Sequence, residues 1–289
     1  MAIEIGVYLL TSTHVGAGAS SGAIDLPIAR EGHTGHPLLP ASALKGVARR
    51  LVEGSAKTEA ARLFGPPPPQ KGQPSEALTP GEAVFTDGAL LAFPVRSLSH
   101  SFVWITSPYC IDRWRRGRRL LGLKSPEGRN QSEPCATFTH TGALVLDNYA
   151  VSLPGTASAQ LAAVAAAWAA LLPKDDGVAQ ALPRRLVCLT DADFSHLVQR
   201  CTPVTARVQL TPGKTTDTYR DDDGNEFKGN LWYEESLPAE CLFAFGVQAR
   251  AGGDLTALSK AISNRGKAMQ LGGNETVGMG MTAWTLASA

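Results

Sequence analysis

Strand-like and helix-like patterns alternate along this chain, and long segments with neither pattern separate them. Residues 2–11 have the apolar alternation of a strand. Residues 42–52 have apolar residues at helical spacing, and Ser42 is expected to cap that helix. Residues 14–40, between the two, are rich in glycine and lack a helical period. A loop of this length in a compact domain is usually functional.

The rest of the chain continues this alternation, and its 29 glycines and 19 prolines predict many turns. Strands are expected at 84–86, 90–95, 102–108, 186–191, 241–249 and 281–287, and helices at 157–172, 193–201 (capped by Asp191 or Asp193) and 254–268. Strand–helix–strand units joined by insertions predict one α+β domain over residues 1–289, with an antiparallel sheet and helices on one face. The insertions are expected at about 65–81 and 110–140, and a long polar hairpin at about 204–235.

The overall charge is balanced, with 27 basic and 26 acidic side chains. Proteins that bind nucleic acid alone are usually strongly basic, because phosphate contacts supply their affinity. Any RNA contact must therefore come from local patches. One patch is a basic run, for which a solvated loop is the alternative interpretation; it comprises Arg113, Arg115, Arg116, Arg118, Arg119 and Lys124.

Cysteine usage and the chain's start favour a cytoplasmic protein. The five cysteines include no CxxC pair, and their odd number argues against a disulfide framework, so reduced thiols are expected. The first residues lack a basic signal-peptide region, and no window is long and apolar enough to predict a membrane span.

Three weaker motifs do not support a function. Residues 16–22 (GAGASSG) almost match a dinucleotide-binding fingerprint, but the last spacing is one residue too long and extended DLPI follows instead of a helix. There is no GxxxxGK[ST] loop for nucleotide hydrolysis. His33 and His36 could ligate a metal with His14 or Asp25, but the spacing matches no zinc motif.

Five segments, in order along the chain, carry a resemblance to a known family. They are residues 13–46, 85–109, 189–210, 231–238 (LWYEESLP) and 271–280 (LGGNETVGMG). Together they resemble the backbone subunits of Cmr-type (type III-B) CRISPR effector complexes, in the RAMP superfamily. The related Csm-type backbone subunit and the guide-processing nucleases are the alternatives within that superfamily.

The resemblance implies a ferredoxin-like, RRM-like core with large loop insertions and a β-hairpin thumb. Copies of such subunits stack helically along a CRISPR guide RNA, together with other Cmr-complex subunits. Each thumb displaces nucleotides of the guide–target duplex, and each copy cuts the target RNA beside it. A divalent metal (Mg²⁺ or Mn²⁺) is implied for cleavage, without a tightly bound cofactor, and attack by the 2′-OH is expected. The hairpin at 204–235 is the thumb candidate, with the 65–81 loop as the alternative.

The resemblance also assigns catalytic residues. Asp25 matches the family's aspartate, and a carboxylate beside a scissile phosphate can position a metal or help to activate a 2′-OH. His14 can act as an acid or base, or bind a phosphate. Glu234 and Tyr233 match functional hairpin residues, one for catalysis and one for stacking or orienting RNA. Glu235 is the alternative carboxylate.

Guide-RNA contacts are expected from a second group of residues. Lys45 lies near the start of the helix that Ser42 begins, where backbone amides and an ammonium group can hold a phosphate. Glycine amides of LGGNETVGMG allow close approach to phosphates. The remaining candidates are Arg49, Arg96, Arg207, Gly272, Gly273 and Gly278.

Three functions are compatible with these features. The first is an RNA-guided endoribonuclease subunit. The second is a non-catalytic RNA-binding scaffold of the same or a Csm-type complex. The third, a stand-alone processing enzyme, is disfavoured because a near-neutral chain must capture RNA without neighbouring subunits.

Overall fold

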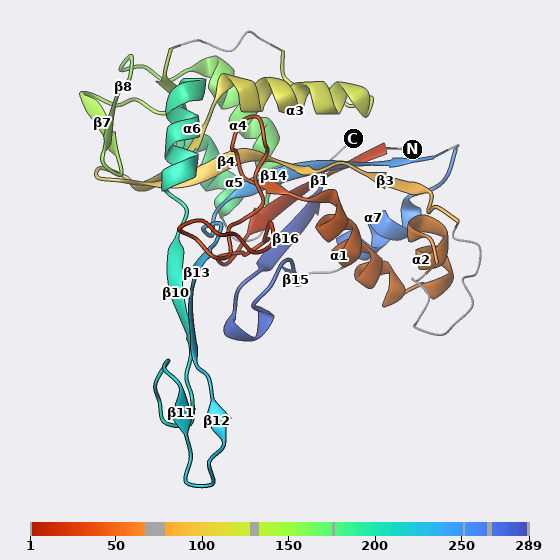
Figure 1. The fold of residues 1–289 in the computed structure, drawn as a ribbon. Coiled ribbons are helices and arrows are strands. Elements are labelled where there is room, and N and C mark those ends of the chain that lie inside the picture. The colour runs from red at the N-terminus through yellow and green to blue at the C-terminus, as the bar shows by residue number, and fades with distance from the viewer. Residues whose placement is uncertain are drawn as a thin grey trace.

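One large mixed sheet organises the chain in the computed structural model (Figure 1). The structure describes residues 2–66, 79–127, 133–174, 177–250, 252–264 and 268–287. Within these ranges the central strand order is β15-β16-β1-β14-β4-β5-β9-β6, antiparallel throughout except for the parallel β5 and β9. The strands of this path are β1 (Ala2–Leu9), β4 (Gly88–Ser97), β5 (Ser101–Thr106), β6 (Cys135–Ala136), β9 (Leu186–Cys188), β14 (Leu242–Ala249), β15 (Met269–Gln270) and β16 (Met281–Leu286). Short strands beside it are β2 (Leu38–Leu39), β3 (Ala83–Phe85), β7 (Ala143–Leu146) and β8 (Tyr149–Ser152).

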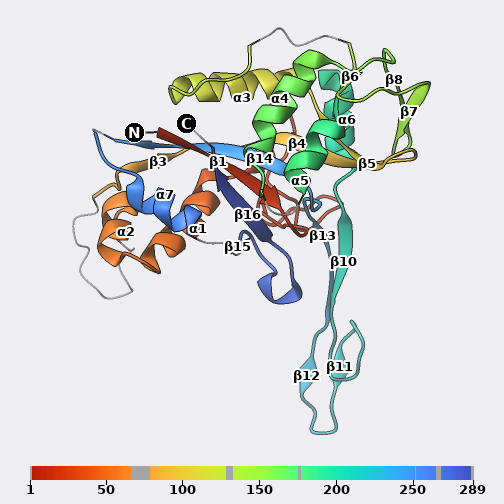
Figure 2. The same ribbon diagram turned by 180° about the vertical axis from the view of Figure 1, so that it is seen from behind.

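Helices cover both faces of this sheet, as the opposite views show (Figures 1 and 2). One hydrophobic cluster contains residues of α1 (Ala41–Glu53), α2 (Lys57–Phe64), α6 (Asp191–Arg200) and α7 (Thr256–Ser263). The other contains residues of α3 (Pro108–Leu120), α4 (Ala159–Ala169), α5 (Val178–Ala181) and the short 3₁₀ helix η1 (Leu182–Arg184). The predicted α+β class is therefore confirmed, but the prediction that helices lie on one face is wrong.

Strand β1 shows why both faces are covered. Its alternate residues Ile5 and Val7 lie in the first cluster, whereas Tyr8 lies in the second. Gly6 allows the chain after α4 to approach, because a Cβ there would lie 2.3 Å from the Leu171 carbonyl oxygen. A strand buried on both sides needs apolar or small residues at successive positions, which β1 has apart from Glu4.

Two predicted helix caps are wrong. Ser42 lies inside α1, whose N-cap is Pro40, and the Asp87 carboxylate accepts a hydrogen bond from the Ala41 amide at 2.7 Å. Helix α6 is capped by the Thr190 side chain rather than by Asp191 or Asp193. The contact of Asp87, which lies between β3 and β4, with the start of α1 cannot be recognised from the local sequence.

The five arginines of the basic run lie on helix α3 and Lys124 follows it, so the predicted loop insertion at 110–140 is wrong over its first part. Ser107 caps α3, and Ile111 and Trp114 pack into the core. Arg113 and Arg118 pair with the buried Glu31 and Glu4. Burial raises the pKa of the Glu4 carboxyl, against the opposing charge of the Arg118 guanidinium. Most of the predicted 65–81 insertion lies outside the described residues.

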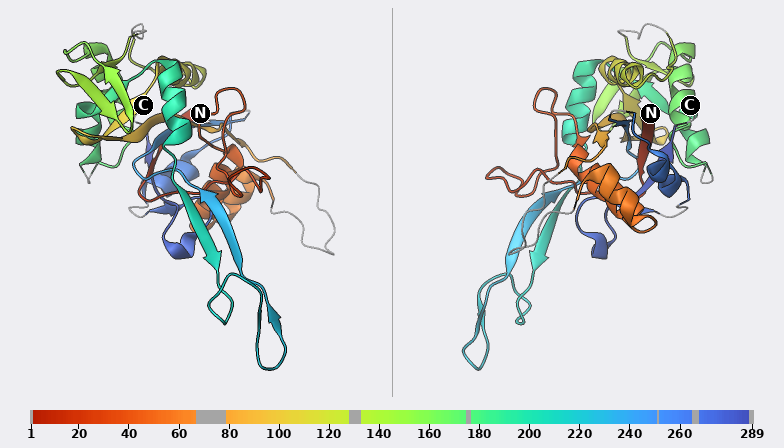
Figure 3. Two further views of the ribbon diagram at one scale, coloured as in Figure 1. Left: turned by 60° about the vertical axis from the view of Figure 1, so that its left-hand side comes forward. Right: turned by 90° about the vertical axis from the view of Figure 1, so that its right-hand side faces the viewer.

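The predicted hairpin at 204–235 is present and projects from the body of the domain (Figures 1 and 3). Its stem pairs β10 (Val204–Gln209) with β13 (Asn230–Glu235), and β11 (Tyr219–Arg220) pairs with β12 (Glu226–Phe227) nearer the tip. Val208 and Leu231 are directly opposite each other and about half exposed. The stem therefore presents apolar surface to its surroundings, while its role as a thumb stays a prediction. No helix in the described ranges has the length and apolar character needed to cross a membrane.

Candidate functional site

Strand β13 holds the long loop of residues 14–40 against the hairpin stem. Leu26 forms an isolated parallel bridge with Glu234. The Leu26 amide donates to the Tyr233 carbonyl at 3.1 Å, and the Glu235 amide donates to the Leu26 carbonyl at 3.0 Å. The loop thus lies beside β13 at Leu26 like a short extra strand. This pairing fixes the position of the loop although Leu26 is not part of a regular strand.

Asp25 lies at the exposed edge of this contact. Its Oδ2 accepts a hydrogen bond from the Tyr233 amide at 2.7 Å, and its carbonyl accepts one from the Ser20 amide at 2.8 Å. The side chain is exposed, so its carboxylate is available to a ligand. Tyr233 is also exposed, at 45%, and its ring is accessible for stacking.

Glu235, the alternative carboxylate, is committed to the protein interior. Its carboxylate accepts hydrogen bonds from Arg30 at 2.6 Å, from the Thr202 hydroxyl at 2.6 Å and from the Ile28 amide at 3.0 Å. Burial alone would raise the pKa of the Glu235 carboxyl, but the hydrogen bonds from Thr202 and Arg30 outweigh it and the pKa lies below its usual value. Glu235 therefore anchors the loop to β13 and has little capacity left for substrate.

His14 is oriented by two backbone segments. Its Nδ1 lies 2.6 Å from the Glu235 carbonyl oxygen, which can only accept, so Nδ1 carries a proton. The Nε2 side of the ring lies over Gly16, where a Cβ would be 2.7 Å away. The His14 carbonyl accepts from the Gly273 amide at 3.0 Å, and a Cβ on Gly272 would lie 2.1 Å from the same oxygen. Glycine is needed at 272 for this close approach.

Glu234 is the buried centre of a polar cluster. It is 4% exposed and accepts a hydrogen bond from the Asn274 side-chain amide. One of its oxygens lies 3.7 Å from Arg207 Nε and the other 3.9 Å from His14 Nδ1. Glu234 thus connects the histidine, the arginine and the glycine-rich turn, and Asn274 is a site residue that the sequence reasoning did not select.

The glycine-rich turn, residues 271–280, has a backbone conformation that brings Asn274 to Glu234. Asn274 and Gly278 have φ values of 62° and 81° and flank the 3₁₀ helix η2 (Glu275–Val277). The Met279 amide donates to the Asn274 carbonyl at 3.2 Å, and Met279 Sδ accepts from Arg207 Nη2 at 2.7 Å. Asparagine tolerates the left-handed conformation better than most residues. An asparagine within this glycine-rich segment was therefore the sequence signal that could have identified Asn274 as a site residue.

The structure does not join the other predicted RNA contacts to this cluster. Ser42 and Lys45 lie on α1, exposed and half-buried, respectively. Arg49 forms an ion pair with Glu53 one turn further along α1, at 2.6 Å. Arg96 is exposed on β4. By contrast, Asp25, His14, Tyr233, Glu234, Arg207, Gly272 and Gly273 are connected through β13 and the glycine-rich turn.

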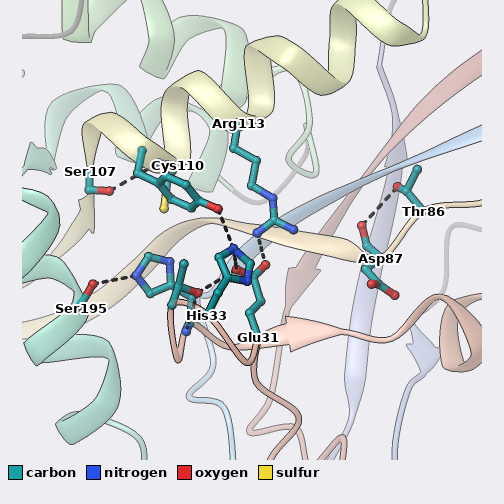
Figure 4. Close-up of polar contacts among 11 residues, drawn as sticks. Glu31, His33, Thr86, Asp87, Ser107, Cys110, Arg113 and Ser195 are labelled. Carbon is teal, nitrogen blue, oxygen red and sulfur yellow. Dashed lines mark hydrogen bonds and ion pairs between the residues drawn. The ribbon is translucent and has the colours of Figure 1, made fainter.

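A second polar network fastens the same loop to α3 and α6 (Figure 4). Glu31 pairs with Arg113 of α3. His36 is 3% exposed, and its Nε2 lies 2.9 Å from the Ser195 hydroxyl of α6. Burial lowers the pKa of His36, with a smaller opposing effect of the Asp191 charge. The loop that carries Asp25 is therefore held at both ends by buried contacts.

The histidines of this network do not form a metal centre. His33 is 68% exposed and contacts the Tyr109 hydroxyl at 3.0 Å, whereas His36 points to α6. In the part of the chain that the structure describes, no three His, Cys, Asp or Glu side chains are grouped closely enough to hold a metal ion.

Comparisons with known proteins agree with this architecture. The RAMP superfamily sequence model matches residues 7–281. The CRISPR system Cmr endoribonuclease Cmr4 of Pyrococcus furiosus is 32% identical, over 98% of this chain and 94% of that protein. The crystal structure of oligomeric Cmr4 from the same organism has a TM-score of 0.75 at 26% identity, covering 100% of this chain and 98% of that chain.

A more distant structure has the same fold. A cryo-EM structure of the type III-B Cmr-beta complex bound to cognate target RNA contains a chain with a TM-score of 0.73 at 18% identity. The match covers 99% of this chain and 97% of that one. The hairpin, the long loop and the sheet thus lie within an alignment that spans nearly the whole chain.

Proposed function

The chain belongs to the RAMP superfamily, and from that premise we propose that it is the backbone subunit of a type III-B CRISPR effector complex. In this role it binds the guide RNA, stacks with further copies of itself and other Cmr subunits, and cleaves target RNA paired to the guide. The exposed carboxylate of Asp25, held by the Tyr233 amide beside the projecting hairpin, is the observation that carries this proposal.

Asp25 and His14 have complementary chemical capacities. The Asp25 carboxylate can accept a proton from a ribose 2′-OH, directly or through a bound water. Attack of that oxygen on phosphorus forms the 2′-O–P bond and breaks the P–O5′ bond, and the leaving oxygen takes up a proton. His14 has Nδ1 committed to the Glu235 carbonyl, so Nε2 is the nitrogen that can exchange a proton or contact phosphate.

Glu234 and Tyr233 have different roles in this proposal. The Glu234 carboxylate is buried between Asn274, Arg207 and His14, so it orients these groups rather than taking a proton from RNA. Tyr233 is half exposed on the hairpin stem and can stack against a displaced base. The hairpin then acts as the thumb that separates bases beside the phosphate to be cut.

A divalent ion, Mg²⁺ or Mn²⁺, fits this site only when the bound RNA supplies part of its coordination. Mg²⁺ is commonly bound by one or two carboxylates together with substrate phosphates and waters. Asp25 offers one exposed carboxylate, and no preformed group of three ligands exists among the described residues. The ion would neutralise charge on the scissile phosphate while Asp25 holds it at the site.

The remaining arginines and glycines supply RNA contacts in this proposal. Lys45 and the exposed Arg96 offer cations to guide phosphates, and Arg49 does so only if its pairing with Glu53 opens. Arg207 lies beside Glu234 in the cluster, and in this proposal its guanidinium also contacts a guide phosphate. These contacts stay proposals that phosphate-by-phosphate footprinting can test.

The deciding experiment compares the wild type with Asp25→Asn in the reconstituted complex, with and without Mg²⁺. Asparagine keeps an acceptor for the Tyr233 amide but cannot take a proton, so target cleavage should fall at least 10²-fold. Guide and target binding, measured by gel shift, should stay unchanged. Asp147→Asn is the matched control, because Asp147 is an exposed aspartate in the turn between β7 and β8.

The outcomes separate the two candidate functions. A regular ladder of products that Asp25→Asn abolishes and Asp147→Asn preserves supports cleavage by this subunit. Equal ladders from the wild type and Asp25→Asn would remove Asp25 from the chemistry. Tight guide and target binding without cleavage by any variant, at any Mg²⁺ or Mn²⁺ concentration, would favour the scaffold function.

A further inference from the structure

Two of the five cysteines face each other across neighbouring strands, far from the site described above. Cys135 of β6 is the direct antiparallel partner of Cys188 of β9, and each is 3% exposed. Opposite residues of such a pair have Cα atoms about 4.5–5.5 Å apart. That spacing lies within the roughly 4.4–6.8 Å found between Cα atoms of disulfides. The backbone therefore places the two Cα atoms within the range found for disulfides.

Cys135 differs from the other four thiols in acidity. The contact with the Cys188 thiol lowers the pKa of Cys135 to about 7 in spite of burial, and the Ser158 hydroxyl assists. The same contact raises the pKa of Cys188. Burial raises the pKa of the remaining three thiols, which are Cys110 (to about 12), Cys201 (to about 11) and Cys241.

We propose that Cys135 and Cys188 form an oxidation site that takes hydrogen peroxide and closes to a cross-strand disulfide. The Cys135 thiolate attacks a peroxide oxygen, the S–O bond forms, the O–O bond breaks, and hydroxide leaves with a proton as water. The Cys188 sulfur then attacks the sulfenic sulfur of Cys135. The S–S bond forms, the S–O bond breaks, and the departing hydroxide takes the Cys188 proton as a second water.

The burial of the pair selects the oxidant. With each residue only 3% exposed, the pair admits a small oxidant more readily than a peptide disulfide such as oxidised glutathione, which meets the surrounding strands. Cys135 serves as the nucleophile because its contacts with Cys188 and Ser158 lower its pKa. Ser158, which touches Cys135, is also the N-cap of α4, so the thiolate lies near the positive end of that helix.

The fold allows the small closure that the bond requires. Cβ atoms of opposite residues lie roughly 4.5–5.5 Å apart, against about 3.5–4.5 Å in a disulfide, so the strands must approach by about 1 Å. Strand β6 is two residues long and forms the end of the sheet's central path, and on its other side only the bridge between Ala136 and Ala157 and the hydrogen bond from the Ser158 amide to the Ala136 carbonyl are recorded for the described residues. Strand β9 leads through α6 to the hairpin stem. Oxidation would therefore fix β6 to β9, next to the chain segment that leads to the hairpin.

The test uses the full-length reduced protein treated with hydrogen peroxide, then unfolded and labelled with N-ethylmaleimide. Wild type should lose two of its five labelled thiols, and a linked pair of tryptic peptides, 130–174 and 186–200, should appear by mass spectrometry. Cys188→Ser should stop at a sulfenic acid on Cys135 that dimedone traps. Oxidised glutathione at the same concentration should react at least 10-fold more slowly.

The matched control is Cys201→Ser, which keeps the pair and should form the linked peptides as fast as the wild type. Each variant is checked by circular dichroism, and Cys188→Ala replaces Cys188→Ser if the serine variant does not fold. Five labelled thiols in treated wild type, or loss of two labels in Cys135→Ser as well, would overturn the proposal. Cleavage activity is not a readout here, so the result is independent of the proposed function.

Discussion

Replacing Glu235 with alanine should destabilise the fold more than any exposed charge deletion. The substitution leaves Arg30 without its carboxylate and removes the acceptor for the Ile28 amide and the Thr202 hydroxyl. Breaking a buried ion pair from one side costs about 3–5 kcal/mol. Arg30 is 22% exposed and keeps the Gly35 carbonyl as an acceptor, so part of its charge stays solvated. We therefore expect a loss of about 3 kcal/mol in unfolding free energy.

Urea denaturation followed by tryptophan fluorescence measures this loss. Glu226→Ala is the matched control, because its pair with Arg220 lies on the hairpin with both side chains more than a third exposed. Exposed pairs contribute about 0–1 kcal/mol, so the control midpoint should hardly move. Equal midpoints for Glu235→Ala and Glu226→Ala would refute the reasoning that Glu235 anchors the loop.

The pH dependence of the same variants gives an independent check. The folded-state pKa of Glu235 lies below its usual 4.5, so its stabilisation is complete above that pH and is lost as the pH falls through the folded value. The stability difference between wild type and Glu235→Gln should therefore shrink below about pH 4.5. A difference that grows on acidification would contradict the assigned charge state.

Two further variants test neighbouring contacts. Gly272→Ala should displace His14 and reduce cleavage at least 10-fold, because its Cβ would lie 2.1 Å from the His14 carbonyl oxygen at a φ of 82°. Gly117→Ala, with open space at its Cβ on the exposed side of α3, should keep activity in the same assay. His36→Gln should flatten the decline in melting temperature between pH 7.5 and 5.5. Burial lowers the folded-state pKa of His36 below 6.5, so its stabilisation is present above that pH and is lost as the pH falls; an unchanged pH profile would exclude His36 as the titrating group.

Periodicity predicted the longer strands of the sheet well because they are consistently apolar. The strands expected at 2–11, 241–249 and 281–287 correspond to β1, β14 and β16 with small changes at their ends. Local patterns failed where distant residues decide the structure. The sequence of helix α3 allowed a basic loop because the partners of Arg113 and Arg118, which are Glu31 and Glu4, lie far away in sequence.

The sequence pointed to residues that the fold brings together, while their roles in a site stay predictions. Sequence blocks pointed to Asp25, His14 and Glu234, and the structure brings all three to β13. Two adjacent glutamates cannot be distinguished by spacing. Only the fold directs Glu235 to Arg30 and leaves Glu234 beside His14.

The geometry makes the hairpin and the loop that carries Asp25 one mechanical unit. The Asp25 side chain is fixed by the backbone of Tyr233, and the following two residues of β13 hold Leu26 and the ring of His14. Any movement of the hairpin stem therefore moves the carboxylate and the imidazole together. Under the proposed function, a duplex that pushes the hairpin aside would displace these two side chains as well, so a productive duplex must fit the hairpin before its phosphate can meet Asp25. Under the same proposal, the fit of the duplex around the hairpin, and not the sequence of the target, determines whether the carboxylate is in place.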